Sequence, residues 1–250
     1  MRVARLAGAL LAIASVIAPA NAEERLSLPT RAGVTETVLF DAAPQPIASI
    51  VLFPGGNGVI DEEPDNFVLR IRGSFAAQNL SVAAIDAPSD HRAGVPIDFR
   101  NTPEAAEDAA AVVAFLRSKA AVPVWLLGTS NGSVSASNAA ARLGPGQVAG
   151  IVLTSSVWAG GMSNAALGAI AVPVLIVHNR DDGCRLSPFA SAAAALDVLA
   201  KAPAKELLAV SGGRLSSPAC KAHSPHGYYG IEDQVVPPVI AWIKAQTAAR

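Results

Sequence analysis

Short apolar runs alternate with segments of helical pattern along most of the chain. The runs are rich in Val, Ile and Leu and are bounded by turn residues, which is typical of strands that are buried on both faces of a parallel sheet. The predicted strands are residues 35–40, 47–53, 81–87, 122–128, 147–156, 172–179 and 204–210.

The segments between these strands favour helices. In the clearest one, Thr102 is a suitable N-cap, Pro103 occupies the first helical position, and Glu104 suits the positive end of the helix dipole. The predicted helices are residues 65–79, 102–120, 131–143, 188–201 and 232–246. Repeated strand-then-helix order predicts an α/β fold, with a doubly wound, mostly parallel sheet and helices on both faces, in a single domain of residues 23–250.

The first 22 residues differ from the rest of the chain. Two arginines precede an apolar run from Leu6 to about Pro19, and an Ala-Asn-Ala sequence ends at Ala22. This pattern predicts a secretory signal peptide over residues 1–22 and export to the periplasm or the extracellular space. The alternative is a membrane anchor, but the run is shorter than the ~20 residues of a spanning helix. We therefore expect no membrane attachment after cleavage.

Composition argues against several classes of partner. Without the first 22 residues the chain keeps 17 basic and 20 acidic side chains, a net charge of −3, and these charges are scattered. With neither a basic block nor many aromatic residues for base stacking, we expect no nucleic-acid partner. No H-E-x-x-H motif is present, so we expect no metal site and no cofactor.

The chain has two cysteines, Cys184 and Cys220. In an exported protein an even pair predicts a disulfide, because the compartment is oxidising. The bridge would close a loop of 36 residues and stabilise the fold by about 3–4 kcal/mol. Two buried thiols are the alternative.

One serine stands where a strand pattern changes to a helical pattern, in the sequence Gly128-Thr129-Ser130-Asn131-Gly132. A serine at a tight strand-to-helix turn is strained and exposes its hydroxyl, and small residues two positions away let the strand and helix pass close by. The sequence matches G-x-S-x-G in the structural context that this motif requires. Ser130 is therefore the candidate nucleophile.

With this motif the chain resembles the α/β-hydrolase superfamily, in particular small secreted serine hydrolases of the esterase kind. The resemblance implies a serine, acid and histidine in that order, on loops at one edge of the sheet. It also implies hydrolysis of a carboxylic ester through an acyl-enzyme, with thioesters and amides left open. The substrate would be a small or polymeric ester. A hydrolase-like binding protein that has lost catalysis is the alternative.

The resemblance also implies the other members of the triad. The family commonly has its aspartate four residues after a histidine at a strand end, which selects Asp182 after His178 and leaves Asp181 as the alternative. The family's base is followed by glycine and an aromatic residue, which selects His226 over His223. A bond between the two cysteines would tie the acid loop to the histidine loop.

The family often has a His-Gly-Gly turn after an early strand, and this chain has Pro54-Gly55-Gly56 there. The resemblance implies an oxyanion hole made by the backbone N–H groups of Gly56 and Asn131, with Asn57 as the alternative to Gly56. An ordinary glycine turn is the other reading of this sequence.

The sequence says less about the substrate cleft. The interval 156–171, where many hydrolases insert a lid, is long enough for a short helix but not for a lid domain. Arg100 suits either a substrate anion or the capping of backbone carbonyls, and we favour the capping role. The apolar residues of the interval suit either a cleft wall or the core, and they are Trp158, Met162 and Leu167.

Overall fold

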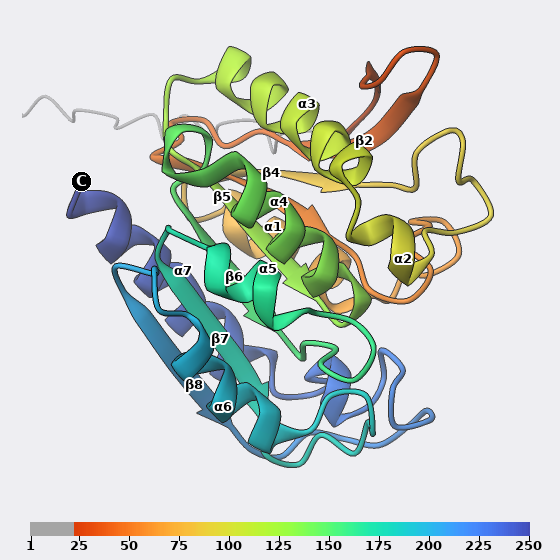
Figure 1. The fold of residues 1–250 in the computed structure, drawn as a ribbon, viewed down its shortest axis with the longest axis vertical. Helices are drawn as coiled ribbons and strands as arrows, with labels where there is room; N and C mark the ends of the chain where they lie inside the picture. The colour runs from red at the N-terminus through yellow and green to blue at the C-terminus, as the bar shows by residue number, and fades with distance from the viewer. Residues whose placement is uncertain (1–22) are drawn as a thin grey trace, which may run out of the picture.

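A computed structural model of the protein describes residues 23–250, so the predicted signal peptide lies outside the described residues. The fold is one sheet of eight strands with helices on both of its faces (Figure 1). The strands are β1 (Glu24–Pro29), β2 (Thr35–Asp41), β3 (Ala48–Phe53), β4 (Leu80–Ile85), β5 (Val124–Thr129), β6 (Gly150–Thr154), β7 (Val174–Asn179) and β8 (Lys205–Val210).

The strand order is β1-β2-β4-β3-β5-β6-β7-β8. Strands β3 to β8 are parallel, while β2 pairs antiparallel with β4 and with β1. The predicted doubly wound, mostly parallel sheet is confirmed. The sequence pattern missed β1, because this edge strand has only two partly buried apolar residues, Leu26 and Leu28.

Helices cover the two faces of the sheet unequally (Figure 1). Side chains of α3, α4, α5 and α6 join the apolar core on one face, and side chains of α1 and α7 join the core on the other. The helices are α1 (Phe67–Ala76), α2 (Ile97–Arg100), α3 (Pro103–Lys119), α4 (Asn131–Gln147), α5 (Asn164–Ala169), α6 (Phe189–Val198) and α7 (Glu232–Ala248).

The central strands are buried along their whole length, as their apolar sequences predict. Trp125 on β5 is fully buried, and Gly150 makes room for it, since a Cβ atom there would lie 2.1 Å from the indole ring. The indole N–H donates to Thr247 Oγ1 at 3.0 Å. The close packing of these strands fixes where each one ends, and the loops that follow them carry the candidate site.

The segment between β6 and β7 carries no lid domain. The interval 156–171 contains only α5, whose N-cap Ser163 accepts a hydrogen bond from the Ala166 amide at 3.1 Å. Met162 and Leu167 of this interval are buried in the core, and Trp158 packs against it. In the part of the chain that the structure describes, no helix has the length and apolar character to cross a membrane.

Candidate active site

Ser130 lies in the turn between β5 and α4, with φ of 50° and ψ of −126°. A non-glycine residue rarely adopts such a conformation, which is strained and is found mostly at functional sites. The turn is held because the Ser130 amide donates to Thr154 O at 3.0 Å. Gly128 and Gly132 are both required, since a Cβ at Gly132 would lie 2.0 Å from Phe53 O and one at Gly128 would lie 2.4 Å from Gly132 O.

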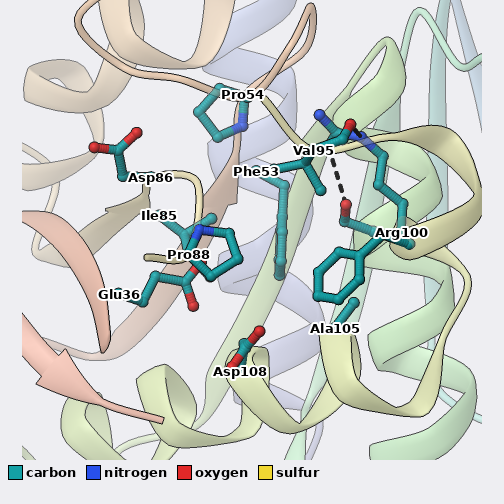
Figure 2. A pocket seen from close by; sticks show the side chains of 13 residues that line it. Glu36, Phe53, Pro54, Ile85, Asp86, Pro88, Val95, Arg100, Ala105 and Asp108 are labelled. Atoms are coloured by element: carbon teal, nitrogen blue, oxygen red, sulfur yellow. Dashed lines mark hydrogen bonds between the residues drawn. The ribbon is translucent and has the colours of Figure 1, made fainter. Parts of the chain in front are cut away.

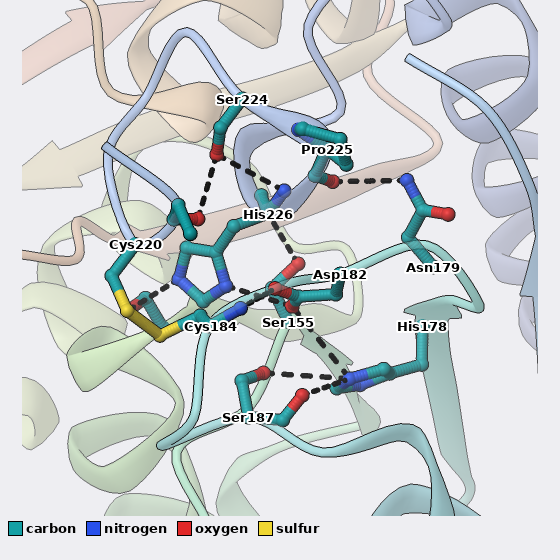
Figure 3. A network of polar contacts seen from close by, with 12 residues as sticks. Ser155, His178, Asn179, Asp182, Cys184, Ser187, Cys220, Ser224, Pro225 and His226 are labelled. Carbon is teal, nitrogen blue, oxygen red and sulfur yellow. Dashed lines mark hydrogen bonds and ion pairs between the residues drawn. A yellow bond between two sulfur atoms is a disulfide. The ribbon is translucent and has the colours of Figure 1, made fainter. Parts of the chain in front are cut away.

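The structure brings three sequence-predicted residues together, and Figure 3 shows the contact between two of them, His226 and Asp182. Ser130 Oγ lies 2.9 Å from His226 Nε2, and His226 Nδ1 lies 2.8 Å from Asp182 Oδ2. The carboxylate accepts a hydrogen bond from the Nδ1–H group, so Nε2 is free to accept a hydrogen bond from the Ser130 hydroxyl. Asp182 Oδ1 is fixed by the Cys184 amide at 2.8 Å. The Asp182 side chain is fully buried and that of His226 is 4% exposed, so bulk water does not compete for these bonds.

The two alternatives lie elsewhere. Asp181 Oδ2 accepts a hydrogen bond from the Gly212 amide at 2.6 Å. His223 Nε2 lies 3.7 Å from Asp65 Oδ2, and the side chain is 37% exposed. Each therefore has its own partner outside the serine–histidine–aspartate arrangement.

His178 is a neighbour of this arrangement (Figure 3). It is fully buried, and its Nε2 donates to Ser187 O at 2.9 Å and lies 3.8 Å from Asp182 Oδ2. Burial lowers the pKa of His178, so the ring is neutral at physiological pH. The His178 ring therefore adds no positive charge beside the Asp182 carboxyl group.

The chain segment that carries His226 is anchored at several points. The predicted disulfide between Cys184 and Cys220 is present, and it joins this segment to the loop of Asp182. Asn179 Nδ2 donates to Pro225 O at 3.0 Å, and Ser155 Oγ donates to His226 O at 2.6 Å. The sequence did not identify Asn179 and Ser155 as anchors, although Asn179 ends β7 and Ser155 directly follows β6.

Tyr228 is a further anchor that the sequence pattern placed only as the aromatic residue of a motif. Its hydroxyl donates to Val177 O at 2.8 Å and accepts from the Ser155 amide at 2.9 Å. The ring is fully buried against Phe67, and burial raises the pKa of the Tyr228 hydroxyl above its ordinary value. The side chain therefore stays neutral and ties the end of β7 to the histidine segment.

The turn after β3 faces Ser130 from the other side. Gly58 N donates to Gly55 O at 3.1 Å, and Gly56 at the second position of this turn has φ of 61°, which favours glycine. Gly56 O accepts from Asn131 Nδ2 at 2.8 Å. The Gly56 and Asn131 backbone N–H groups donate no hydrogen bond within residues 23–250, and Gly56 lines the pocket of Ser130 and His226. The Asn57 backbone N–H also donates no hydrogen bond among the described residues, so Asn57 remains the alternative to Gly56.

Arg100 lies behind this turn and is 2% exposed. Its guanidinium donates to Val95 O at 3.1 Å, Ser135 Oγ at 3.1 Å and Gly56 O at 3.4 Å, so it caps carbonyls as we favoured. It lines a cavity of about 30 Å³ together with three carboxyl groups (Figure 2). Burial lowers the pKa of Arg100 to about 10.

The three carboxyl groups of this cavity belong to Glu36, Asp86 and Asp108. Asp108 accepts two hydrogen bonds from Arg31, and Asp86 Oδ1 accepts from the amides of Ile60 and Ala87. Glu36 is 3% exposed and its Oε2 has no partner among the described residues. No group of three or more His, Cys, Asp or Glu side chains between residues 23 and 250 is arranged to hold a metal ion.

Comparison with known proteins gives a result for the fold. No protein-family model and no curated protein sequence matches this chain. Among solved structures, Est1E from Butyrivibrio proteoclasticus is 15% identical with a TM-score of 0.66, over 90% of this chain and 99% of that chain. A dienelactone hydrolase from Anabaena variabilis is 18% identical with a TM-score of 0.66, over 90% and 98%.

A third solved structure is that of DcsB in complex with its substrate analogue, with 17% identity and a TM-score of 0.70. The match covers 91% of this chain and all of that chain, so these likenesses extend over nearly the whole described structure. The chain has the fold of the α/β-hydrolases, as its sequence led us to expect.

Proposed function

We propose that this protein is a serine hydrolase that cleaves carboxylic esters with Ser130 as nucleophile, His226 as base and Asp182 as the acid that orients it. The observation that carries the proposal is the continuous hydrogen-bonded series from Ser130 Oγ through the imidazole to Asp182, at 2.9 and 2.8 Å. A serine hydroxyl is a weak nucleophile at neutral pH, and it needs such a base within hydrogen-bond reach.

The reaction follows from the positions of these atoms. Ser130 Oγ attacks the ester carbonyl carbon while its proton passes to His226 Nε2, and Asp182 stabilises the imidazolium that forms. The tetrahedral intermediate collapses when the alcohol leaves with the proton from Nε2, and the acyl group stays on Oγ. Water then attacks the acyl-enzyme through the same base, which releases the acid and restores the hydroxyl.

Charge on the carbonyl oxygen needs donors that are already in place. The backbone N–H groups of Gly56 and Asn131 supply them in this proposal, because both lie at the turns that flank Ser130 and neither donates within the described chain. A pre-organised donor of this kind is worth about 3–4 kcal/mol of transition-state stabilisation. We also propose that the protein acts outside the cytoplasm, which the disulfide and the predicted signal peptide both support.

The proposal is tested by labelling. A fluorophosphonate should modify the wild-type protein at Ser130 and should not modify Ser130→Ala. Nitrophenyl acetate should be hydrolysed by the wild type and not by Ser130→Ala. The matched control is Ser133→Ala, since this neighbouring serine is fully buried and donates to Ser130 O. Equal labelling of wild type and Ser130→Ala, without turnover by either, would favour the binding protein that has lost catalysis.

A further inference from the structure

The pocket in front of Ser130 is lined by Asn66, whose side-chain N–H group is used neither by the fold nor by the proposed triad. The pocket has a volume of about 40 Å³, and the residues that line it include Gly56, Ser130, His226, Asn66, Phe67 and Ala222. A water molecule needs about 10–15 Å³ of such volume, so there is room for a group of two or three heavy atoms.

Asn66 is the N-cap of α1, and its Oδ1 accepts from the Val68 amide at 3.3 Å. This bond fixes which end of the amide faces the helix, so Nδ2 points away from it. The residue is 7% exposed, yet Nδ2 donates to no residue in the described part of the chain. Among the described residues, Nδ2 is not one of the buried polar side-chain atoms that lack a partner, so solvent reaches it and it can donate to an acceptor that enters the pocket.

Nδ2 lies close to the proposed nucleophile. A Cβ atom added to Gly55 would be 2.9 Å from Ser130 Cβ and 3.3 Å from Asn66 Nδ2, so both atoms border the same small space. An oxygen on a substrate group in the pocket would give Nδ2 the acceptor that the protein does not provide.

The walls of the pocket are fixed, which limits the size of that group. Cys220 is bonded to Cys184, and Gly227 packs so closely on Ala222 that a Cβ at Gly227 would lie 2.0 Å from Ala222 O. Arg70 also bridges this wall, with Nη2 donating to Gly227 O at 2.8 Å and Nη1 donating to Ala222 O at 3.4 Å. The pocket therefore cannot widen for a long alkyl chain without breaking these contacts.

The rim of the pocket is polar as well. Lys221 Nζ lies 3.5 Å from Glu63 Oε1, and the two side chains are 59% and 23% exposed. Opposite charges that pair with each other leave the rim without a net charge, so the pocket suits a neutral polar group better than an ion.

We infer that the natural ester carries a short group with a hydrogen-bond-accepting oxygen close to the scissile bond, and that Asn66 Nδ2 donates to this oxygen. The inference rests on the proposed function and adds a substrate class to it. Asn66 is then a residue that determines specificity, and it does so in addition to its role at the start of α1.

Two pairs of esters of equal chain length test the inference. On the acyl side, nitrophenyl methoxyacetate is compared with nitrophenyl butyrate, and on the alcohol side 2-methoxyethyl acetate is compared with butyl acetate. Each pair differs by one oxygen in place of one methylene. The measured quantity is the kcat/KM of the ester with the extra oxygen divided by the kcat/KM of its partner. Comparing this ratio between wild type and variant removes the difference in intrinsic reactivity between the two esters.

Asn66→Ser keeps an N-cap acceptor and loses the amide donor, whereas Asn66→Ala loses both. We expect the oxygen-to-methylene ratio to fall about three- to tenfold in both variants, in the pair whose oxygen reaches the pocket. The melting temperature should fall clearly only in Asn66→Ala. Asn101→Ser is the control, because its Nδ2 donates to Ile97 O away from this pocket, and its ratios should equal those of the wild type.

An unchanged ratio in both pairs for Asn66→Ser, with all four esters still cleaved, would overturn the inference and leave the proposed function standing. Asn66 would then be an N-cap alone, and Asn66→Ala would lose stability without any change in either ratio. If the wild type cleaves none of the four esters and no fluorophosphonate labels Ser130, the proposed function fails, and the inference fails with it.

Discussion

Two groups of buried polar side chains lie near the carboxyl ends of the parallel strands, and they differ in how many of their atoms have hydrogen-bond partners. Around His226, the serine, the imidazole and the carboxylate are hydrogen-bonded in series, and Figure 3 shows the contact of the imidazole with Asp182. In the cavity behind the turn after β3, Glu36 Oε2 has no partner among the described residues and Arg100 donates only to neutral oxygens (Figure 2).

The difference shows that a perturbed ionisation does not by itself mark a catalytic group. Burial, with the nearby Asp108 and Asp86, raises the pKa of Glu36 well above its ordinary value, and burial lowers the pKa of Arg100 to about 10. Neither side chain reaches a nucleophile that could use a proton. The cavity instead supports the turn of Gly56, because Arg100 donates to Gly56 O at 3.4 Å. Geometry has to be examined before a pKa shift is interpreted as function.

The largest effect should come from removing the base. His226→Ala should lower kcat/KM for nitrophenyl acetate about 10⁴-fold or more, because Ser130 would lose its proton acceptor. His223→Ala should stay within a few-fold of the wild type, since His223 lies beside Asp65. Circular dichroism checks that both variants are folded. An inactive His223→Ala beside a fully active His226→Ala would contradict the assignment of the base.

The two neighbouring aspartates give the next comparison. In Asp182→Asn the amide oxygen can still accept from the Cys184 amide, so Nδ2 would face His226 Nδ1 and force the proton onto Nε2. An imidazole in that tautomer cannot accept the Ser130 proton, and kcat should fall about 10⁴-fold. Asp181→Asn loses only a charge beside the Gly212 amide, and kcat should change little. Equal losses in the two variants would show that charge near this loop matters more than orientation.

The sequence predicted the site well where the necessary information is local. Ser130 and its two glycines lie within residues 128–132. Both candidate histidines lie in one short segment, so only the choice between them depended on the three-dimensional structure. The elements of the parallel sheet were equally local, because each buried strand is a short apolar run. The edge strand β1 was missed since its outer positions are exposed and polar.

The supporting contacts could not be predicted in this way. Arg70 is bonded to Gly227 across 157 positions, and Tyr228 is bonded to Ser155 across 73. No pattern in the neighbourhood of either residue specifies its partner, because the partner is fixed only when the sheet has placed the two loops together. The same is true of Arg100, for which the sequence left two roles open until the carbonyls around it were known.

Removing the support that Arg100 gives to the turn of Gly56 should lower kcat less than removing a residue of the proposed triad. In Arg100→Gln the carbonyl of Gly56 would lose one donor but keep Asn131 Nδ2, so we expect kcat to fall about tenfold, less than the loss of a whole oxyanion donor. KM should change little, since the guanidinium lies behind the turn and not in the pocket of Ser130. Arg92→Gln is the control, because among residues 23–250 Arg92 donates a hydrogen bond only to Ser89 O, in an exposed loop. A folded Arg100→Gln with wild-type kcat would contradict the supporting role.

The smallest expected effect is on the stability of the folded protein, and its size depends on pH. Glu36 is buried, and its carboxyl interacts with the charges of Asp86, Asp90, Asp108 and Arg31. Because the pKa is raised from 4.5 in the folded protein, the folded state keeps a proton that the unfolded chain releases. The stability that Glu36 contributes is therefore complete below about pH 4.5 and is lost as pH rises towards the pKa of the folded state.

Glu36→Gln removes this titration and keeps the shape of the side chain. Thermal melts of wild type and variant should converge near pH 4, and the variant should become the more stable of the two by a margin that grows as pH rises to 8. Glu206→Gln, on the exposed start of β8, should show no margin that grows in this direction. The wild type has a buried carboxylic acid that can lose its proton as pH rises, whereas the amide of the variant cannot. If the difference between the two melting temperatures were the same at pH 4 and pH 8, Glu36 would have to be ionised or exposed in the folded protein, and the contrast between the paired network and the unpaired cavity would be lost.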